Sequence, residues 1–270
     1  MRSRTSPQDL VACFRDTWAF ANSPAISGLT EAAAKSSRVY REGFTSEKSG
    51  TADPAARVRI VEQSSFEAAR ELCPAGRTAV LNFANPVEPG GGVLRGATAQ
   101  EESLCRCSNL YPCLLTEAAQ ADYYEYHRAL GGHVFTDRLI YTRDVLVFKD
   151  EEELPQMLPE SERFRVDIIT CAAPYSQSVR VDPERLARIF RSRIRNILEA
   201  AVDNDAAVLI LGAFGCGAFG NDPVLVAEAF RDVLRDGGYE RRIPQIVFAV
   251  KRSRSGVSRN LLAFRACFES

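Results

Sequence analysis

The stretch that decides the fold is residues 78–102, TAVLNFANPVEPGGGVLRGATAQEE. It begins with a nearly continuous apolar run, Thr78–Ala84, which is typical of a strand buried on both faces of a sheet. A loop with prolines and three successive glycines follows, and an acidic helix start closes the stretch. Glycine adopts positive φ and lets the backbone pass close to a ligand. Because ligands of open α/β sheets bind beyond the carboxyl ends of strands, this loop is a candidate site.

Outward from this stretch, apolar strands alternate with amphipathic helices. The pattern predicts a three-layer α/β domain with a mostly parallel or mixed sheet. The expected strands are 58–61, 78–84, 139–141, 145–148, 166–170, 207–211 and 246–250. The expected helices are 65–71, 100–108, 116–130, one that begins at Asp182-Pro183, one from Asp222-Pro223 to about Arg235, and 258–268.

The N-terminal segment differs from this alternation. Ser6-Pro7 predicts a capped amphipathic helix to about Ala21. Residues 23–56 are rich in Ser, Ala, Gly and Pro, with a weak helical pattern near Glu31–Lys35, and are expected to be a loosely structured lead-in that packs on the main domain. We therefore divide the chain into an N-terminal helical extension, 1–56, and a main α/β domain, 57–270.

Composition excludes several classes of protein. The 270 residues carry 34 Lys and Arg against 35 Asp and Glu, a formal net charge of -1, which argues against a general footprint for duplex nucleic acid. No apolar run is long enough to span a bilayer, and no signal peptide is expected. The 8 cysteines are scattered, which favours reduced thiols in the cytoplasm. The acidic run 150–153 is expected to be a solvated loop.

A second glycine-rich loop follows another buried strand, in residues 211–223, LGAFGCGAFGNDP. Successive backbone amides before a helix start can bind an anion. The loop lacks the Lys-Ser/Thr of a P-loop and is not a GxGxxG fingerprint. A diphosphate held by backbone alone would need no catalytic metal. In the first loop, a capping box formed by Thr98 and Glu101 would explain one glutamate but leaves Glu102 unexplained.

Together the two loops carry a resemblance. The motifs are Asn85-Pro86, the triple glycine, Gln100-Glu101-Glu102 with the sequence after it, and the 211–223 loop. Together they resemble the microbial-type poly(ADP-ribose) glycohydrolases over roughly residues 57–268. The resemblance implies a macrodomain with a mixed central sheet. It also implies a hydrolase that cleaves the ribose–ribose O-glycosidic bonds of poly(ADP-ribose) and releases ADP-ribose, with no metal and no organic cofactor.

The resemblance also implies the roles of individual residues. Glu102 would be the catalytic acid and base, Glu101 would orient the ribose and support Glu102, and Asn85 would hydrogen-bond the ribose. Phe219 would pack on the distal ribose, and Phe248 would stack on adenine. The other substrate-binding residues would be Gly90, Gly91, Gly92 and Gln100 beside the catalytic helix, and Gly215, Cys216, Gly217, Ala218 and Gly220 around the diphosphate.

The chemistry of the bond supports these roles. Its cleavage passes through an oxocarbenium-like state, and the leaving hydroxyl needs a proton. Adjacent helical residues point about 100° apart, so Glu101 and Glu102 are not expected to flank the sugar. One carboxyl, with its pKa raised by burial, would act first as acid and then as base toward water.

Other functions stay open on the sequence alone. One alternative is a macrodomain that binds ADP-ribose without cleaving it. The others are a hydrolase that removes mono-ADP-ribose from a macromolecule and a nucleotide-sugar phosphatase. The expected partners are poly(ADP-ribose) or ADP-ribosylated macromolecules, with ADP-ribose as product, and no membrane. We expect a monomeric, cytoplasmic protein. The resemblance implies that it reverses ADP-ribosylation, including in the DNA damage response.

Overall fold

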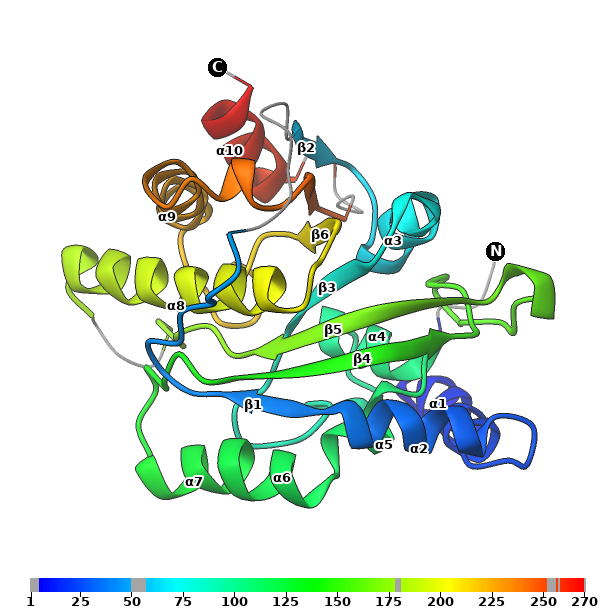
Figure 1. Ribbon diagram of the computed structural model, residues 1–270. Coiled ribbons are helices and arrows are strands. Elements are labelled where there is room, and N and C mark those ends of the chain that lie inside the picture. The colour runs from blue at the N-terminus through cyan, green and yellow to red at the C-terminus, as the bar shows by residue number, and fades with distance from the viewer. Residues whose placement is uncertain (1–4, 50–56, 178–180, 252–255, 257, 270) are drawn as a thin grey trace.

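A seven-stranded sheet lies at the centre of the computed structural model, which describes residues 5–49, 57–177, 181–251, 256 and 258–269. The strand order is β1-β4-β5-β3-β6-β7-β2 (Figure 1). Neighbours from β5 through β2 pair in parallel, whereas β4 and β1 are antiparallel. The predicted α/β class with a mixed sheet is therefore confirmed. The strands are β1 Arg38–Tyr40, β2 Arg57–Val61, β3 Thr78–Phe83, β4 Leu139–Val147, β5 Phe164–Cys171, β6 Val208–Leu211 and β7 Gln245–Ala249.

Helices cover both faces of the sheet. One face carries α8, α9 and α10, and the other carries α1 to α7 (Figure 1). The N-caps Ser6, Asp182, Asp222 and Ser258 each accept a main-chain N–H through the side chain, as the sequence predicts for helix starts. The helices are α1 Pro7–Ala21, α2 Ser27–Ser36, α3 Ser65–Leu72, α4 Gln100–Cys107, α5 Leu110–Leu114, α6 Glu117–Ala119, α7 Tyr126–Leu130, α8 Pro183–Asp203, α9 Pro223–Asp236 and α10 Arg259–Phe268.

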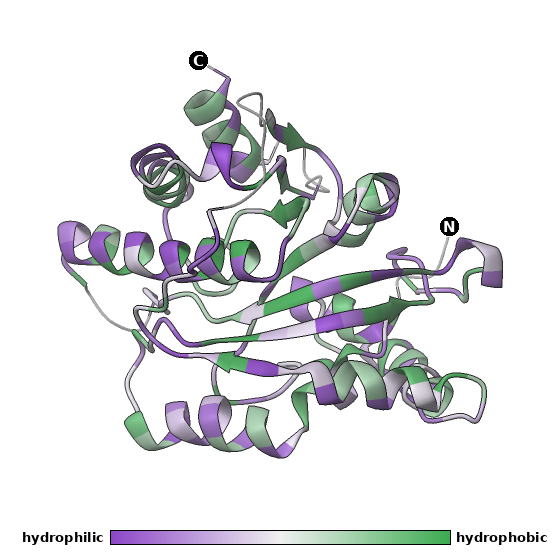
Figure 2. Cartoon of the chain, in the orientation of Figure 1, coloured by the Kyte–Doolittle hydropathy of each residue, from purple (hydrophilic) through white to green (hydrophobic). Residues whose placement is uncertain are grey.

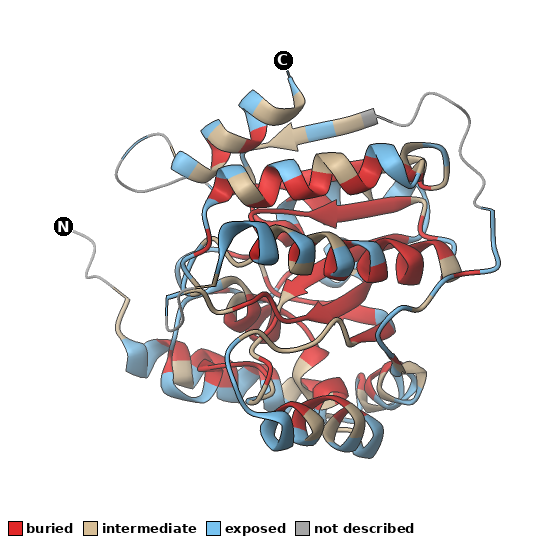
Figure 3. Ribbon diagram, turned by 90° about the vertical axis from the view of Figure 1, so that its left-hand side faces the viewer, coloured by how far each residue is buried: buried red, intermediate tan, exposed pale blue. Residues whose placement is uncertain are grey.

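The core has two halves because successive strand residues point to opposite faces. Leu209 and Leu211 pack toward α8 and α9, whereas Val208 and Ile210 pack toward α3 and α4. Apolar residues concentrate on the strands and on the inner faces of the helices (Figure 2). The inner strands β3, β5, β6 and β7 are the most deeply buried part of the fold, whereas β2 at the edge is partly exposed (Figure 3).

Strand β4 corrects the sequence prediction of two strands, 139–141 and 145–148. The structure has one strand with an irregularity between Thr142 and Val145, where Asp144 has φ 55°. Such a bulge reverses which alternate residues face the core. Ile140 before the bulge and Val145 after it consequently reach the same half of the core.

The N-terminal segment is more ordered than the sequence predicts. Residues 27–36 form α2, and β1 pairs with β4 as the edge strand of the sheet. Phe14 of α1 is buried in the core half that contains α4. Residues before position 57 thus contribute to the same sheet and core as those after it. Among the described residues, no helix is both long enough and apolar enough to cross a membrane.

Candidate active site

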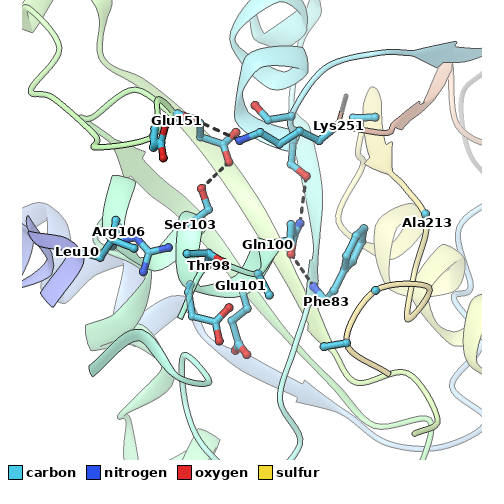
Figure 4. A pocket seen from close by; sticks show the side chains of 18 of the residues that line it. Leu10, Phe83, Thr98, Gln100, Glu101, Ser103, Arg106, Glu151, Ala213 and Lys251 are labelled. Atoms are coloured by element: carbon cyan, nitrogen blue, oxygen red, sulfur yellow. Dashed lines mark hydrogen bonds between the residues drawn. The ribbon is translucent and has the colours of Figure 1, made fainter. Parts of the chain in front are cut away.

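The carboxyl ends of the parallel strands meet at one edge of the sheet and open onto a cavity of about 1030 Å³. Loops that follow β2, β3, β5, β6 and β7 all contribute to its wall, as does the start of α4 (Figure 4). Ligand binding beyond the carboxyl ends of strands is what an open α/β sheet predicts. The two glycine-rich loops, distant in sequence, are brought together here.

Two buried carboxylates lie in the first turn of α4. Glu101 is 3% exposed and Glu102 is 7% exposed. Glu101 accepts hydrogen bonds from the main-chain N–H of Asn85 at 2.6 Å and from Asn82 Nδ2 at 3.4 Å. Glu102 Oε1 accepts from the main-chain N–H of Gly92 at 2.8 Å, while its Oε2 is buried without a partner among the described residues.

Gly91 shows how closely the two carboxylates approach the loop. A Cβ at Gly91 would lie 2.6 Å from Glu102 Oε1 and 3.0 Å from Glu101 Oε2, and its φ is +56°. Both facts require glycine at this position. The two carboxylates therefore converge on the backbone of the loop at Gly91.

The electrostatics of this pair favour a retained proton. Burial raises the pKa of Glu101 to about 8, and the negative charge of Glu102 adds to that shift, against the hydrogen bond from Asn85. At neutral pH the free site therefore keeps a carboxyl proton.

The predicted capping box at the start of α4 is wrong. The N-cap is Ala99 rather than Thr98, and no side chain caps this helix end. Glu101 turns instead toward Asn82 and Asn85, because tertiary hydrogen bonds from β3 and the following loop take up its carboxylate. The capping explanation for Glu101 is thus removed, and both glutamates belong to the site.

Asn85 is placed at the cavity wall, but part of its side chain is already committed. Its Oδ1 accepts from the main-chain N–H groups of Val87 and Glu88 at 2.9 and 2.8 Å, which shapes the turn into the glycine loop. Among the residues that the structure describes, no acceptor bonds its Nδ2.

Gln100, predicted to bind substrate, lines the cavity, and its side-chain amide bonds the protein itself. Its Oε1 accepts from Phe83 N at 2.9 Å, and its Nε2 donates to Leu81 O at 2.8 Å and to Ser65 Oγ at 3.0 Å (Figure 4). The pairing of β3 with β6 ends at Val80 and Ile210. Beyond that point the Gln100 amide bonds the main chain of β3 as a neighbouring strand would. This side chain fixes α4 to the sheet beside the carboxylates.

The 212–222 loop has the form expected of an anion site. Asn221 braces it from within, since its Nδ2 donates to Pro174 O at 2.8 Å and to Gly215 O at 2.9 Å. Within the described part of the chain, no acceptor bonds the main-chain N–H groups of Gly215, Gly217, Ala218 and Phe219, and all four residues line the cavity. Consecutive free amides of this kind bind phosphate oxygens.

The remaining predicted members of this loop also have defined surroundings. Phe219 lines the cavity with its ring 5.3 Å from that of Tyr175, and Gly220 lies with φ +69° against Gln177. Burial raises the pKa of the Cys216 thiol to about 12, so this thiol carries no charge against a diphosphate at neutral pH.

Phe248 is not brought to the cavity. Its side chain is fully buried in the core half formed with α9 and α10, where its ring lies 5.1 Å from those of Phe230 and Phe264. On β7 the cavity is reached instead by Ala249, and beyond the strand by Val250 and Lys251. The alternation of strand residues therefore turns Phe248 into the core and away from the cavity.

One corner of the cavity was missed by sequence reasoning, because the acidic run 150–153 reads as a solvated loop. Glu151 is only 8% exposed and accepts from Phe66 N at 2.7 Å and from Ser103 Oγ at 2.9 Å (Figure 4). Lys251 Nζ donates to the Glu151 carbonyl oxygen at 3.5 Å. No sequence signal marks these long-range bonds, which join α3 to α4.

Metal ligation has no support in the side-chain arrangement. Over the residues that the structure describes, no group of three or more His, Cys, Asp or Glu side chains is placed to hold a metal ion. Cys105, Cys107 and Cys113 are buried free thiols, in line with the packing role that the sequence favours.

The fold and the site thus define a macrodomain-like α/β hydrolase with a carboxyl pair beside a glycine loop and an anion loop. The family model for the microbial-type PARG catalytic domain matches residues 17–150, which begin within α1. PARG is poly(ADP-ribose) glycohydrolase. A comparison with curated proteins gives no match.

Solved structures extend this similarity to nearly the whole chain. The poly(ADP-ribose) glycohydrolase from Thermomonospora curvata is 33% identical with a TM-score of 0.83, covering 97% of this chain and 100% of that chain. The same enzyme bound to the inhibitor ADP-HPD gives a TM-score of 0.84. The Deinococcus radiodurans enzyme in complex with ADP-ribose is 33% identical with a TM-score of 0.77, covering 89% of this chain and 96% of that chain. The chain belongs to the microbial-type poly(ADP-ribose) glycohydrolases, which confirms the family and the enzyme class that the sequence predicts.

Proposed function

We propose that Glu102 is the general acid and base of poly(ADP-ribose) hydrolysis and that Glu101 holds the distal ribose beside it. The observation that carries this assignment is the environment of the Glu102 Oε2 atom. This atom is buried and unpartnered among the described residues, while Oε1 is fixed by Gly92. A fixed carboxyl with one free oxygen in the cavity wall is placed to exchange a proton with a bound glycosidic oxygen.

The reaction then runs in two proton transfers. The Glu102 carboxyl donates its proton to the ribose 2′-oxygen that leaves, and the electron pair of the C1″–O bond passes to that oxygen. Water next attacks the oxocarbenium-like C1″ carbon and gives its proton back to Glu102. ADP-ribose leaves, and the carboxyl is restored.

A single acid and base follows from the geometry. Glycosidases with two separate carboxyl roles place the groups about 5–9.5 Å apart across the bond. Glu101 and Glu102 are instead neighbours in the first turn of one helix, and both approach Gly91. One proton is sufficient for this mechanism, since only the leaving oxygen must be protonated, and the raised pKa of Glu101 keeps a proton beside Glu102 at neutral pH.

The substrate is proposed to lie along the strand ends from β3 to β6. The free amides of the 215–219 segment would hold the diphosphate, and Phe219 would pack on the distal ribose. The Asn85 Nδ2 and the 90–92 glycines would enclose that ribose at the carboxylates. The cavity thus binds one ADP-ribose unit with its glycosidic carbon at Glu102.

The division of roles is tested by comparing Glu102→Gln with Glu101→Gln. We expect Glu102→Gln to lower kcat at least about 10³-fold, at the scale of losing a general acid, while ADP-ribose binding stays within a few-fold. Glu101→Gln should lower kcat less and weaken ADP-ribose binding. Near-normal turnover by Glu102→Gln would refute the assignment.

The setting of the activity is proposed on less direct grounds. All 8 cysteines are free, which is typical of a reducing compartment, and we place the protein in the cytoplasm as a monomer. There it would reverse ADP-ribosylation, including that of the DNA damage response. Cell fractionation and light scattering test the two placements.

A further inference from the structure

Arg106 is a buried cation close to the carboxylates, with no role in the reaction as described so far. It lies one turn after Glu102 on α4 and is 3% exposed. Its Nη1 donates to the carbonyl oxygen of Ala97 at 2.7 Å. Among the described residues, no carboxylate approaches its guanidinium within 4.0 Å. A buried charge without a paired acid is costly, so the carbonyl contact calls for an explanation.

The carbonyl that Arg106 binds belongs to the loop that holds Glu102. Ala97 N donates to Gly92 O at 3.1 Å, and Gly92 N donates to Glu102 Oε1 at 2.8 Å. A chain of hydrogen bonds therefore connects Glu102 through Gly92 and Ala97 to Arg106, and both end residues lie on α4. Residues four apart share one helix face, so Glu102 and Arg106 bind the loop at two points from the same face of α4.

The far end of the loop is closed by α1. Thr17 Oγ1 donates to the main-chain oxygen of Arg106 at 2.6 Å. A Cβ at Gly96 would lie 2.3 Å from the Pro7 oxygen, so the loop passes in direct contact with the start of α1. In Figure 4, Arg106 and Leu10 lie on the side of α4 away from Phe83 and Ala213. Arg106 therefore lines the cavity, at the side away from the proposed diphosphate site.

We propose that Arg106 is a positioning residue that clamps residues 92–97 against α4 and thereby keeps the Gly92 N–H on Glu102. The proposal rests on the proposed role of Glu102. Electrostatics agree with this geometry: burial lowers the pKa of Arg106, and the charge of Glu102 opposes that shift. A guanidinium stays protonated even so, and its planar donor set suits a fixed carbonyl better than a lysine does.

Loss of the clamp should affect turnover and not the grip on ADP-ribose. In Arg106→Met the Ala97 carbonyl loses its donor, the loop loosens, and Glu102 is no longer held in one orientation. We expect kcat to fall by roughly 10- to 100-fold, the scale of an ångström-sized misplacement. The dissociation constant of ADP-ribose should stay within about threefold, because the 212–222 loop is untouched. Arg106→Lys keeps one cationic donor and should give an intermediate kcat.

The experiment measures four quantities for each purified full-length variant. They are kcat on poly(ADP-ribose), ADP-ribose affinity by calorimetry, the melting temperature, and hydrogen exchange of a peptide that covers 88–99. Exchange in that peptide should rise in Arg106→Met and elsewhere stay unchanged. Arg143→Met is the matched control. Arg143 lies on β4, away from the cavity, and the change removes its hydrogen bonds to Asn204 Oδ1 at 3.0 and 2.6 Å. Its kcat should equal that of the wild type.

Each outcome decides the proposal. A folded Arg106→Met with wild-type kcat overturns it. A loss of ADP-ribose affinity as large as the loss of kcat also overturns it, since Arg106 would then bind the ligand, and so does faster exchange throughout the chain. If Arg106→Met does not fold, Arg106→Lys and Arg106→Gln must show reduced kcat with faster exchange in 88–99. Full activity in Glu102→Gln would overturn the role of Glu102 itself, whereas an inactive Glu102→Gln beside a fully active Arg106→Met overturns the clamp alone.

Discussion

Replacement of Gly91 by alanine tests the contact between the glycine loop and both carboxylates. The new Cβ would lie 2.6 Å from Glu102 Oε1, whereas ordinary contacts begin near 3.4 Å. The carboxylate or the loop must therefore move by about 0.8 Å. A misplacement of about 1 Å can cost on the order of 10²-fold in rate, or roughly 2.7 kcal/mol of transition-state stabilisation. We expect Gly91→Ala to lower kcat by about that factor.

The strain of alanine at positive φ has to be separated from the contact. Gly238 provides the control, because it has φ 60° and ψ 26° with nothing within 4 Å of an added Cβ. Both variants should lose roughly 1–2 kcal/mol of unfolding free energy from the left-handed conformation. Only Gly91→Ala should lose kcat.

Release of ADP-ribose from poly(ADP-ribose) gives kcat, and urea unfolding gives the free energy of unfolding. The two variants are compared at equal fractions folded. A kcat for Gly91→Ala within threefold of the wild type would refute the contact between the loop and the carboxylates. An equal loss in Gly238→Ala would show that strain, and not the carboxylates, causes the effect.

Three further predictions concern the same site. The pKa of Glu101 is raised to about 8 from an ordinary 4.5. The contribution of this carboxyl to the free energy of unfolding is therefore fully present below about pH 4.5 and is lost as pH rises through 8. Its size is on the order of a few kcal/mol. Urea unfolding between pH 5 and 9 should show that loss in the wild type but not in Glu101→Gln; parallel curves would contradict it. Gln100→Leu leaves Phe83 N and Leu81 O without partners and should lower the unfolding free energy by roughly 2–4 kcal/mol, whereas an unchanged urea midpoint would show that the amide bonds contribute nothing. Gly215→Ala places a Cβ 2.4 Å from that of Ala173 at φ +75°, so calorimetry should show ADP-ribose affinity at least about tenfold lower, and wild-type affinity would remove this loop from the binding site.

Local sequence signals predicted most of the fold. The starts of α8 and α9 follow Asp-Pro pairs whose aspartates cap the helices, and the strand–helix alternation gave the layers. What failed depends on tertiary structure. The capping box at Thr98 failed because Asn82 and Asn85 take the Glu101 carboxylate. Periodicity around position 143 cannot distinguish two strands from one strand with a bulge.

The site was predicted where a motif is contiguous and missed where it is not. Glu101, Glu102 and the 215–219 loop line one cavity, and Gly91 and Gly92 lie against the two carboxylates. Phe248 was misplaced because its position at the end of a strand does not say which face it occupies. Glu151 and Arg106 were missed because their partners, Phe66 and Ala97, are set by the packing of α3, α4 and the loop.

The most direct test of the account is to measure the product that the wild type and Glu102→Gln form from poly(ADP-ribose) without added metal. The account predicts free ADP-ribose from the wild type and almost none from Glu102→Gln, which should still bind ADP-ribose in calorimetry. Comparable release by both proteins would contradict the role of Glu102. Binding without release by the wild type would contradict hydrolysis of the polymer and favour an ADP-ribose reader or a mono-ADP-ribosyl substrate.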